Sequence, residues 1–310
     1  MLICSPSDLE ALAFADQTLM LDPRLILVSL VWGVNFSLVK YALNDFYPLS
    51  FTIVRFSLSA LFLACVMIMT GESLRIERKD ISPLIRLGFI GITLYNILFM
   101  YGLKLTSATS SALLISLSPL FAALIQGISK KERIIFGSGL GILLSSAGVF
   151  LIIQDKPGGI SFSRHDFAGD LLTIFASVCW ALYTIKSKPL LQEYSAVKVT
   201  AYSMAAGSLL LLPISLSELA RQSWSGVSVQ AWVAFGFSTF VSGGIAFSLW
   251  YQGVQRLGVT RTVVYHYFVP FVAVIFAALF LGERISIVQI VGGIGILAGV
   301  ALVQNTQNNP

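Results

Sequence analysis

Long apolar stretches of about 20 residues alternate with short polar connections along the whole chain. A helix needs about 20 mostly apolar residues to cross the hydrocarbon core of a bilayer. The segments of about 10 alternating residues that are typical of an outer-membrane barrel do not occur in the sequence. The pattern predicts ten transmembrane helices, at 25–43, 49–70, 83–103, 108–128, 134–154, 168–186, 198–217, 230–252, 259–281 and 286–304.

Composition supports a membrane protein and excludes several other classes. Of the 310 residues, 56% are hydrophobic and only 11% are charged, whereas soluble domains carry about 25% charged residues. Three cysteines cannot pair completely, so they do not form a disulfide scaffold. A soluble enzyme, a disordered chain and a secreted mini-domain are therefore excluded, and we expect an all-α integral membrane protein.

The basic residues predict the orientation of the spans. Most of the 20 Lys and Arg fall in alternate connections, on the side that also holds both termini. One of these connections carries Arg75, Arg78, Lys79 and Arg86, and another carries Lys130, Lys131 and Arg133. Because basic loops stay in the cytoplasm, we expect a multi-pass protein of the cell membrane with cytoplasmic termini. The net charge of +5 is then explained by loops that face anionic lipid, and no nucleic-acid partner is expected.

The chain contains an internal duplication. From Tyr101 to Val149 it matches the region 151 residues later, for example Pro119 with Pro270, and Trp32 and Lys40 match Trp180 and Lys188 at an offset of 148. We expect a first five-helix repeat at 24–154, a linker at 155–167 and a second repeat at 168–304. Five is odd, so the second repeat is inverted, which is the arrangement of many secondary transporters. A duplicated scaffold without transport is the alternative.

The two ends of the chain complete this division. Residues 1–23 contain Asp8, Glu10, Asp16 and Asp22 and no apolar core, so they do not resemble a signal peptide. We expect a cytoplasmic extension at 1–23, with Met20 as an alternative start of translation, and a cytoplasmic tail at 305–310.

Several motifs resemble those of EamA-type members of the drug/metabolite transporter superfamily. They are Trp32-Gly33-Val34-Asn35-Phe36 with Lys40, Arg55-Phe56, Pro119-Leu120-Phe121-Ala122-Ala123, Gly169-Asp170-Leu171-Leu172, Trp180-Ala181-Leu182-Tyr183, Pro270-Phe271-Val272-Ala273 and Leu281-Gly282-Glu283-Arg284. The resemblance covers about residues 24–304. It implies ten helices in two inverted repeats, a central cavity between the halves and the export or uptake of small metabolites. Tyr265-His266-Tyr267 departs from the usual small or aliphatic residues of the family.

Spans 4 and 9 are candidates for moving parts. Pro119 and Pro270 occupy the same position in each repeat. A proline inside a helix removes a backbone hydrogen bond and kinks the helix, and the freed carbonyls are tolerated only against protein or water. We interpret both prolines as kink or gating candidates, with a static kink as the alternative.

Polar residues inside the spans are candidates for substrate binding. Asn35, Asn96, Ser111 and Ser118 could bind a polar solute or hydrogen-bond neighbouring helices. Arg55 could hold a substrate carboxylate or a helix-terminal carbonyl, or extend to the interface. No acidic residue lies in the middle of a span, so a carboxylate relay is poorly supported.

His266 is the one histidine inside a predicted span. An ionisable residue at that depth is a functional candidate, and histidine suits a proton carrier. Tyr265, Tyr267 and Trp250 could offer aromatic surfaces to a substrate. For His266 the alternative is a neutral histidine that hydrogen-bonds a neighbouring helix, and for the aromatic residues it is a place in an interfacial belt. The alternative to proton coupling is facilitated diffusion.

These observations favour a secondary transporter of small metabolites, an exporter of amino acids or related compounds that works by alternating access. The alternatives are a multidrug exporter of aromatic cations and a membrane-embedded protein without transport. The sequence contains no nucleotide-binding loop, metal cluster or catalytic triad, so we expect no enzyme, cofactor or metal. We expect a small-molecule substrate and the lipid bilayer as partners. Glycine stripes in spans 5 and 10 predict close packing within one chain or between two, which leaves a homodimer open.

Overall fold

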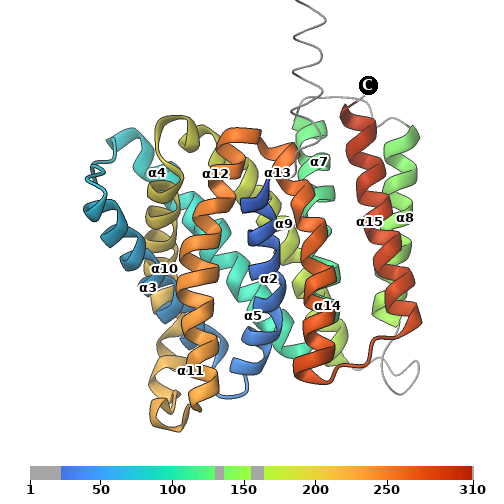
Figure 1. Ribbon diagram of the computed structural model, residues 1–310, viewed down its shortest axis with the longest axis horizontal. Helices are drawn as coiled ribbons and strands as arrows, with labels where there is room; N and C mark the ends of the chain where they lie inside the picture. The colour runs from blue at the N-terminus through green and yellow to red at the C-terminus, as the bar shows by residue number, and fades with distance from the viewer. Residues whose placement is uncertain (1–21, 130–135, 155–163, 309–310) are drawn as a thin grey trace, which may run out of the picture.

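A computed structural model describes residues 22–129, 136–154 and 164–308, and every regular element in these ranges is a helix (Figure 1). The expectations about the N-terminal extension and Met20 lie outside the described residues, apart from the end of the extension at Asp22 and Pro23. The helices of the first half are α2 (Pro23–Ala42), α3 (Pro48–Met69), α4 (Arg78–Gly88), η1 (Phe89–Leu94), α5 (Tyr95–Leu105), α6 (Ala108–Ile115), α7 (Ser118–Ser129) and α8 (Phe136–Gln154).

The second half continues with the same kinds of element. Its helices are α9 (Arg164–Glu193), α10 (Ala196–Arg221), η2 (Trp224–Gly226), α11 (Val229–Gly236), η3 (Phe237–Ala246), α12 (Phe247–Leu257), α13 (Val259–Val263), η4 (Val264–Tyr267), α14 (Phe268–Leu281) and α15 (Ile287–Asn308). Two boundaries differ from the prediction, because α9 begins inside the predicted linker and α15 extends into the predicted tail.

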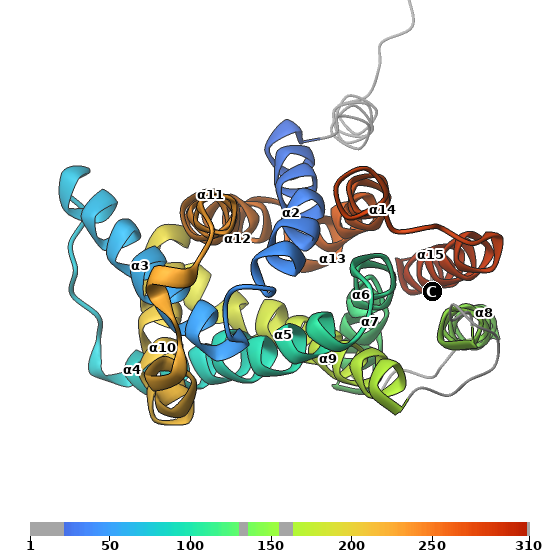
Figure 2. The same ribbon diagram turned by 90° about the horizontal axis from the view of Figure 1, so that it is seen from below.

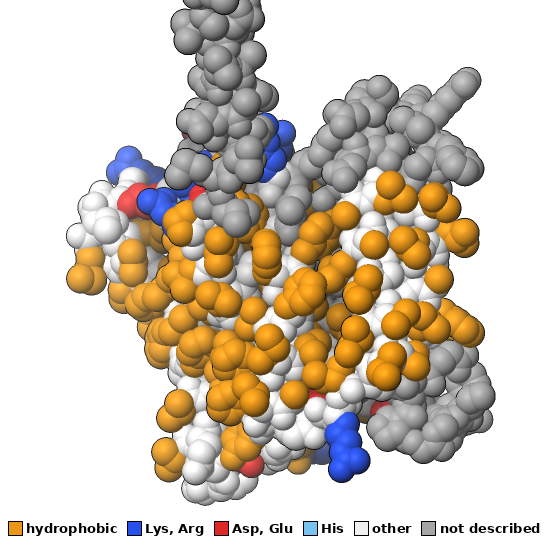
Figure 3. Space-filling model, turned by 45° about the vertical axis from the view of Figure 1, so that its right-hand side comes forward, with side chains coloured by type: hydrophobic (Ala, Val, Ile, Leu, Met, Phe, Trp, Pro, Cys, Tyr) orange, Lys and Arg blue, Asp and Glu red, His pale blue; other side chains and the backbone are white. Residues whose placement is uncertain are grey.

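Eight stretches of the described residues are long and apolar enough to cross a membrane. They correspond to predicted spans 1 to 4 and 6 to 9. The other two predicted spans are α8 and α15, whose apolar parts within the described residues are the shorter Leu143–Ile152 and Ile287–Gly299. Figure 3 shows hydrophobic side chains over most of the visible surface, with charged ones toward its upper and lower ends. The chain is a multi-pass membrane protein.

Local sequence signals explain where several helices begin. Asp22 caps α2 by accepting a hydrogen bond from Arg24 N at 2.9 Å, and Pro23 is the first residue of α2. Ser107 caps α6 through the backbone N–H of Ser110 at 2.9 Å. Proline is tolerated in a first turn because its missing N–H would have no helical partner there, and a capping oxygen satisfies a free N–H.

Corresponding spans of the two halves are irregular at corresponding places. Spans 3 and 8 contain the π-helical segments η1 and η3. Span 4 is divided into α6 and α7, and span 9 into α13, the 3₁₀ turn η4 and α14. Pro119 is the second residue of α7 and Pro270 the third of α14, so each proline lies in the first turn of a new helix, where proline is tolerated. The predicted kinks are therefore breaks between helices.

The helices form two blocks, in which the first helix of each half packs against helices of the other half (Figure 2). In the first block, α2 packs against α11, η3, α12 and α14. In the second block, α9 packs against α4, η1, α5, α6 and α7. The pairs α3–α10 and α8–α15 lie at opposite edges of this arrangement (Figure 2).

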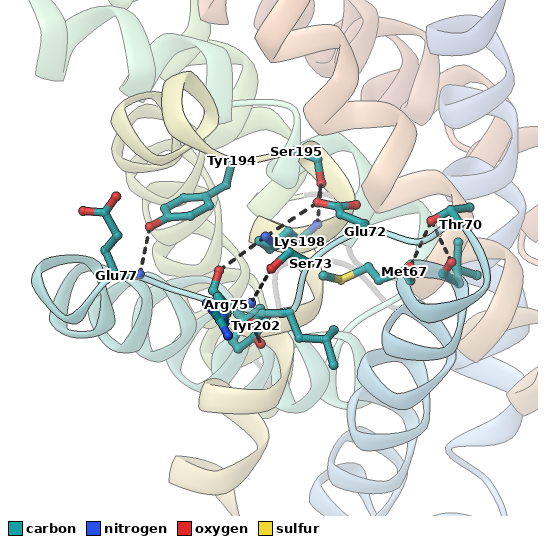
Figure 4. A network of polar contacts seen from close by, with 12 residues as sticks. Met67, Thr70, Glu72, Ser73, Arg75, Glu77, Tyr194, Ser195, Lys198 and Tyr202 are labelled. Carbon is teal, nitrogen blue, oxygen red and sulfur yellow. Dashed lines mark hydrogen bonds and ion pairs between the residues drawn. The ribbon is translucent and has the colours of Figure 1, made fainter.

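The α3–α10 pair is fixed at both ends. At one end the segment after α3 lies across the α9–α10 turn (Figure 4): Ser195 Oγ donates to Glu72 Oε1 at 2.6 Å, and Tyr194 OH accepts from Glu77 N at 3.1 Å. At the other end, Leu49 N of α3 donates to Glu218 Oε2 of α10 at 2.6 Å. In addition, Ser228, which caps α11, donates to Asp45 Oδ2 in the α2–α3 connection through both its hydroxyl and its backbone N–H. These two hydrogen bonds lower the pKa of Asp45.

The glycine stripes of spans 5 and 10 face each other within the chain. A Cβ built on Gly148 would lie 2.4 Å from the Gly292 carbonyl oxygen, and one on Gly299 would lie 2.4 Å from the Gly141 carbonyl oxygen. Such distances leave no space for a side chain, so glycine allows α8 and α15 to approach closely. The stripes therefore have a packing role inside one molecule.

Candidate functional site

A cavity of about 50 Å³ lies between the two blocks. It is lined from α2, α3, α5, α6, α9, η3, α12, η4 and α14. The residues are Trp32, Asn35, Phe36, Arg55, Phe56, Tyr95, Asn96, Phe99, Ile115, Trp180, Ser242, Phe247, His266 and Val269. Sites for small molecules are usually about 300–1,000 Å³, so binding of an organic solute requires that the walls move apart.

Arg55 is the cationic group of this cavity. It is buried, with 3% of its surface exposed. Its Nε donates to the Ser238 carbonyl at 2.9 Å, and its Nη2 lies 3.4 Å from Ser242 Oγ. Among the described residues, no carboxylate forms an ion pair with Arg55. A buried charge without a counter-ion costs several kcal/mol, and the guanidinium is suited to bind a carboxylate through two hydrogen bonds.

Aromatic rings form much of the cavity wall. Trp32 lies 5.2 Å from Trp180 and 5.2 Å from Trp250 between ring centroids. The His266 imidazole stacks on Trp180 at 5.6 Å and lies 5.0 Å from Trp250. Tryptophan faces attract ammonium groups and apolar side chains. The cavity therefore combines one anion-binding group with an aromatic surface.

Some polar atoms of the cavity walls have no hydrogen-bond partner among the described residues. They are Asn35 Oδ1, Trp180 Nε1 and His266 Nε2. His266 Nδ1 is within 3.3 Å of Ser118 Oγ, which orients the ring. Buried polar atoms are nearly always hydrogen-bonded, so these atoms are available to a polar solute.

The structure brings together four of the residues proposed from the sequence and places others nearby. Asn35, Arg55, Asn96 and His266 line the cavity. Asn96 Nδ2 donates to the Ile92 carbonyl of its own span at 2.8 Å. Trp250 and Ser118 contact His266 without lining the cavity.

The remaining candidates lie away from the cavity lining. Ser111 is fully buried. Tyr265 OH accepts a hydrogen bond from Asp22 N at 2.8 Å, which joins η4 to the start of α2. Tyr267 packs against a separate cluster that includes Leu113 and Leu120. Pro119 and Pro270 lie in the first turns of the helices that follow the two breaks. The Tyr-His-Tyr sequence therefore directs one of its three side chains to the cavity.

Sequence reasoning did not propose Trp32, Trp180, Tyr95, Ser242 and Phe247 as site residues. Two of them carried a usable signal, because Trp32 and Trp180 match each other at the offset of 148. Their rings meet face to edge in the cavity, at an interplanar angle of 88°. A large aromatic residue at the same place in both repeats indicates a residue that lies where the two halves meet.

The carboxylates of a separate acidic cluster are bound by other side chains of the protein. Ligand atoms of Glu77, Asp80 and Glu193 lie within 4.8 Å of one another. Lys79 Nζ lies 3.2 Å from Glu77 and 3.1 Å from Glu193, and Tyr194 OH donates to Asp80. The three carboxylates therefore take part in an ion-pair and hydrogen-bond network within the protein.

Comparisons with known proteins agree with this architecture. A solved crystal structure with 20% sequence identity matches with a TM-score of 0.66 and covers 90% of this chain and 94% of its own chain, which shows a shared fold. "Uncharacterized transporter YyaM" of Bacillus subtilis is 30% identical over 88% of this chain and 89% of its own length. A "Probable terminal-alkyne amino-acid exporter" of Streptantibioticus cattleyicolor is 26% identical over 90% and 91%.

The family comparison covers most of the chain and matches it twice. The EamA-like transporter family matches residues 22–154 and again residues 167–304. The resemblance inferred from the sequence motifs is thereby confirmed. The chain belongs to the EamA-like transporter family.

Proposed function

We propose that this protein is a secondary transporter that exports amino acids or related small zwitterions across the cell membrane. The family membership and the multi-pass fold support transport as such. The amino-acid exporter among its relatives supports the substrate class. The observation that carries the proposal is the buried Arg55 guanidinium, which has no acidic partner among the described residues and faces a cavity with tryptophan walls.

In this proposal each end of a zwitterion has a matching group. Arg55 binds the carboxylate. The Asn35 carbonyl oxygen and the faces of Trp32 and Trp180 receive the ammonium group and the side chain. The small cavity volume supports a mechanism in which the walls separate to admit the solute and close around it.

Alternating access is supported by the duplicated architecture. Corresponding spans carry π-helical segments and helix breaks at corresponding positions, and the first helix of each half packs into the other half. Two inverted halves would let the cavity open to either side by exchanging their conformations. The orientation proposed from the basic loops places both termini in the cytoplasm.

Counterflow in liposomes tests the substrate assignment. Purified protein is reconstituted and screened with radiolabelled amino acids, their carboxamides and the organic cation tetraphenylphosphonium. We expect exchange of amino acids but not of carboxamides. Arg55→Met should lower amino-acid counterflow by about 100-fold, the size expected when a buried charge pair loses one partner. Arg221→Met removes an exposed arginine and serves as the matched control.

The aromatic walls favour a second candidate, an exporter of aromatic cations. In that case the organic cation would exchange, amino acids would not, and Arg55→Met would accelerate cation exchange by removing a like charge. Exchange of neither class in a broad panel would contradict both proposals.

His266 remains our proposed coupling residue. Its ring contacts Ser118 on one side and Trp180 on the other, and its Nε2 has no partner among the described residues. If His266 carries the proton, an imposed proton gradient should stimulate wild-type transport, and His266→Gln should remove this stimulation while leaving counterflow measurable. Equal stimulation in both would assign His266 to substrate binding alone.

A further inference from the structure

The turn between α5 and α6 is held by a lysine from the other block. Lys40, near the end of α2, donates from Nζ to the carbonyls of Leu103 at 2.6 Å, Lys104 at 3.1 Å and Thr106 at 2.5 Å. These are terminal carbonyls of α5, where the helix dipole is negative. A cation at this position satisfies carbonyls that have no partner within the helix.

A carboxylate holds the other side of the same turn. Glu283, just after α14, accepts from Ala108 N at 2.8 Å and from Thr109 N at 3.0 Å. These amides begin α6, where the helix dipole is positive. Gly282 has a φ of +65°, a conformation that glycine adopts without strain, and it ends α14 so that the chain turns toward α6.

Both residues join the first block to the second at one end of the cavity. Lys40 lies four residues, or about 6 Å, beyond the cavity residue Phe36 on α2. Ile115, which also lines the cavity, lies about 10 Å along the helix from Ala108. We call the hydrogen bonds of Lys40 and Glu283 to residues 103–109 the latch.

The second half has a corresponding lysine that is not engaged. Lys188 follows Trp180 on α9 at the same spacing at which Lys40 follows Trp32 on α2. Its counterpart target is the end of α12, before the α12–α13 turn. Lys188 is exposed and makes no hydrogen bond or ion pair with the residues that the structure describes. At that end the blocks meet through Gln255 Nε2, which donates to the Leu191 carbonyl at 2.8 Å.

From this asymmetry we infer that Lys40 and Glu283 are gating residues, which hold the cavity closed at the α5–α6 end, and that Lys188 takes the equivalent place at the α12–α13 end when the transporter changes state. Lys40 binds the carbonyls of a helix in the opposite block, and Lys188 would do the same after the change of state. The latch must therefore break for the blocks to separate at its end. This inference rests on the proposed alternating-access function.

Accessibility labelling tests the latch without any substrate. Cys4, Cys65 and Cys179 are replaced by alanine, and Ile115→Cys places a reporter on the cavity wall. A membrane-impermeant maleimide is applied from each side of oriented proteoliposomes. Lys40→Met and Glu283→Gln should each accelerate labelling from the α5–α6 end by about tenfold, as expected for the loss of charge-assisted hydrogen bonds. Lys40→Arg should label like the parent protein.

Two matched controls separate the latch from a general effect of charge. Lys104→Met removes an exposed lysine from the same turn and should leave the labelling rate unchanged. Lys188→Met should not accelerate labelling from the α5–α6 end. If Lys40→Met and Glu283→Gln both label no faster than Lys104→Met, the proposed gating role of the latch is contradicted, even if counterflow demonstrates transport. If they label faster but no solute exchanges, the gate stands and the proposed function fails.

Discussion

The α5–α6 turn and the α12–α13 turn occupy corresponding places in the two halves, yet their surroundings differ. The first is bound by Lys40 at its carbonyls and by Glu283 at its amides. Beside the second, Lys188 is exposed. Because the two lysines match in the sequence repeat, the difference arises from how the blocks are placed. A transporter closed at one end would have this asymmetry, and in the opposite state we expect it to be reversed.

A second difference separates moving contacts from fixed ones. The α3–α10 pair is bound at both of its ends, through Ser195–Glu72 and through Leu49–Glu218. Contacts that are made at both ends at once cannot report which end is closed. We therefore expect rearrangement at the latch and at the helix breaks next to Pro119 and Pro270, while the α3–α10 contacts persist.

Among the tests of this comparison, the largest effect should come from fixing the latch covalently. Ala108→Cys with Glu283→Cys, bridged by a short thiol cross-linker, should lower counterflow to below about a tenth of the unbridged value, because the closed end can no longer open. Counterflow of the proposed amino-acid substrate is measured before bridging, after bridging and after reduction.

The control is a bridge at a contact that we regard as fixed. Glu72→Cys with Ser195→Cys joins the segment after α3 to the α9–α10 turn, and bridging it should leave most of the counterflow. Equal inhibition by the two bridges would remove the distinction between latch and fixed contacts.

A smaller effect is expected from separating α2 and α14 within the first block. A Cβ on Gly33 would lie 2.4 Å from Val272 Cβ and 3.0 Å from the Val269 carbonyl oxygen. Gly33→Ala should therefore lower the Tm by roughly 5 °C through overpacking. Gly236→Ala is the matched control because no atom lies within 4 Å of its Cβ. An unchanged Tm in Gly33→Ala would mean that the first block is less rigid than its packing indicates.

The smallest effect concerns the pH dependence of the contact between Asp45 and Ser228. Hydrogen bonds from the Ser228 hydroxyl and backbone N–H lower the pKa of Asp45 below its ordinary value of 3.8. A carboxyl whose pKa is depressed in the folded state stabilises the fold above its unfolded pKa, and this contribution is lost as the pH falls through the folded value. The Tm should therefore decrease slightly more below pH 4 in the wild type than in Asp45→Asn. Asp45→Asn should not change the labelling rate of Ile115→Cys. Parallel plots of Tm against pH for the wild type and Asp45→Asn would show that Asp45 contributes nothing to stability.

Much of the fold could be predicted from local sequence patterns. The lengths of the apolar runs located eight of the ten predicted spans, because burying a run of apolar residues in lipid depends little on tertiary context. Caps such as Asp22 with Pro23 lie where the helices begin. The sequence indicated kinks at Pro119 and Pro270, and the structure has each proline in the first turn after a helix break. Pattern alone could not distinguish them because the break depends on how α6, α7 and α14 pack.

The site was predictable only in part. Arg55, Asn35 and His266 stood out because placing a polar group inside an apolar span costs free energy, so such a group indicates a functional site. Tyr265 and Tyr267 were proposed for the same neighbourhood, but the η4 turn directs them elsewhere. Trp32 and Trp180 were passed over as single residues because an indole costs much less inside a span than an ionisable side chain, so it does not mark a site. Their shared cavity lies between segments 148 residues apart.

The sequence by itself determined that this chain is a helical membrane protein, where most of its spans lie, that it contains a repeat and that it resembles EamA-type transporters. These properties depend on hydrophobic length and on order along the chain. Only the tertiary structure decided which side chains share the cavity and that Lys40, but not Lys188, is bound to a helix end. The physical reason is that a hydrogen bond between blocks depends on their relative position, which two matching sequences leave undetermined.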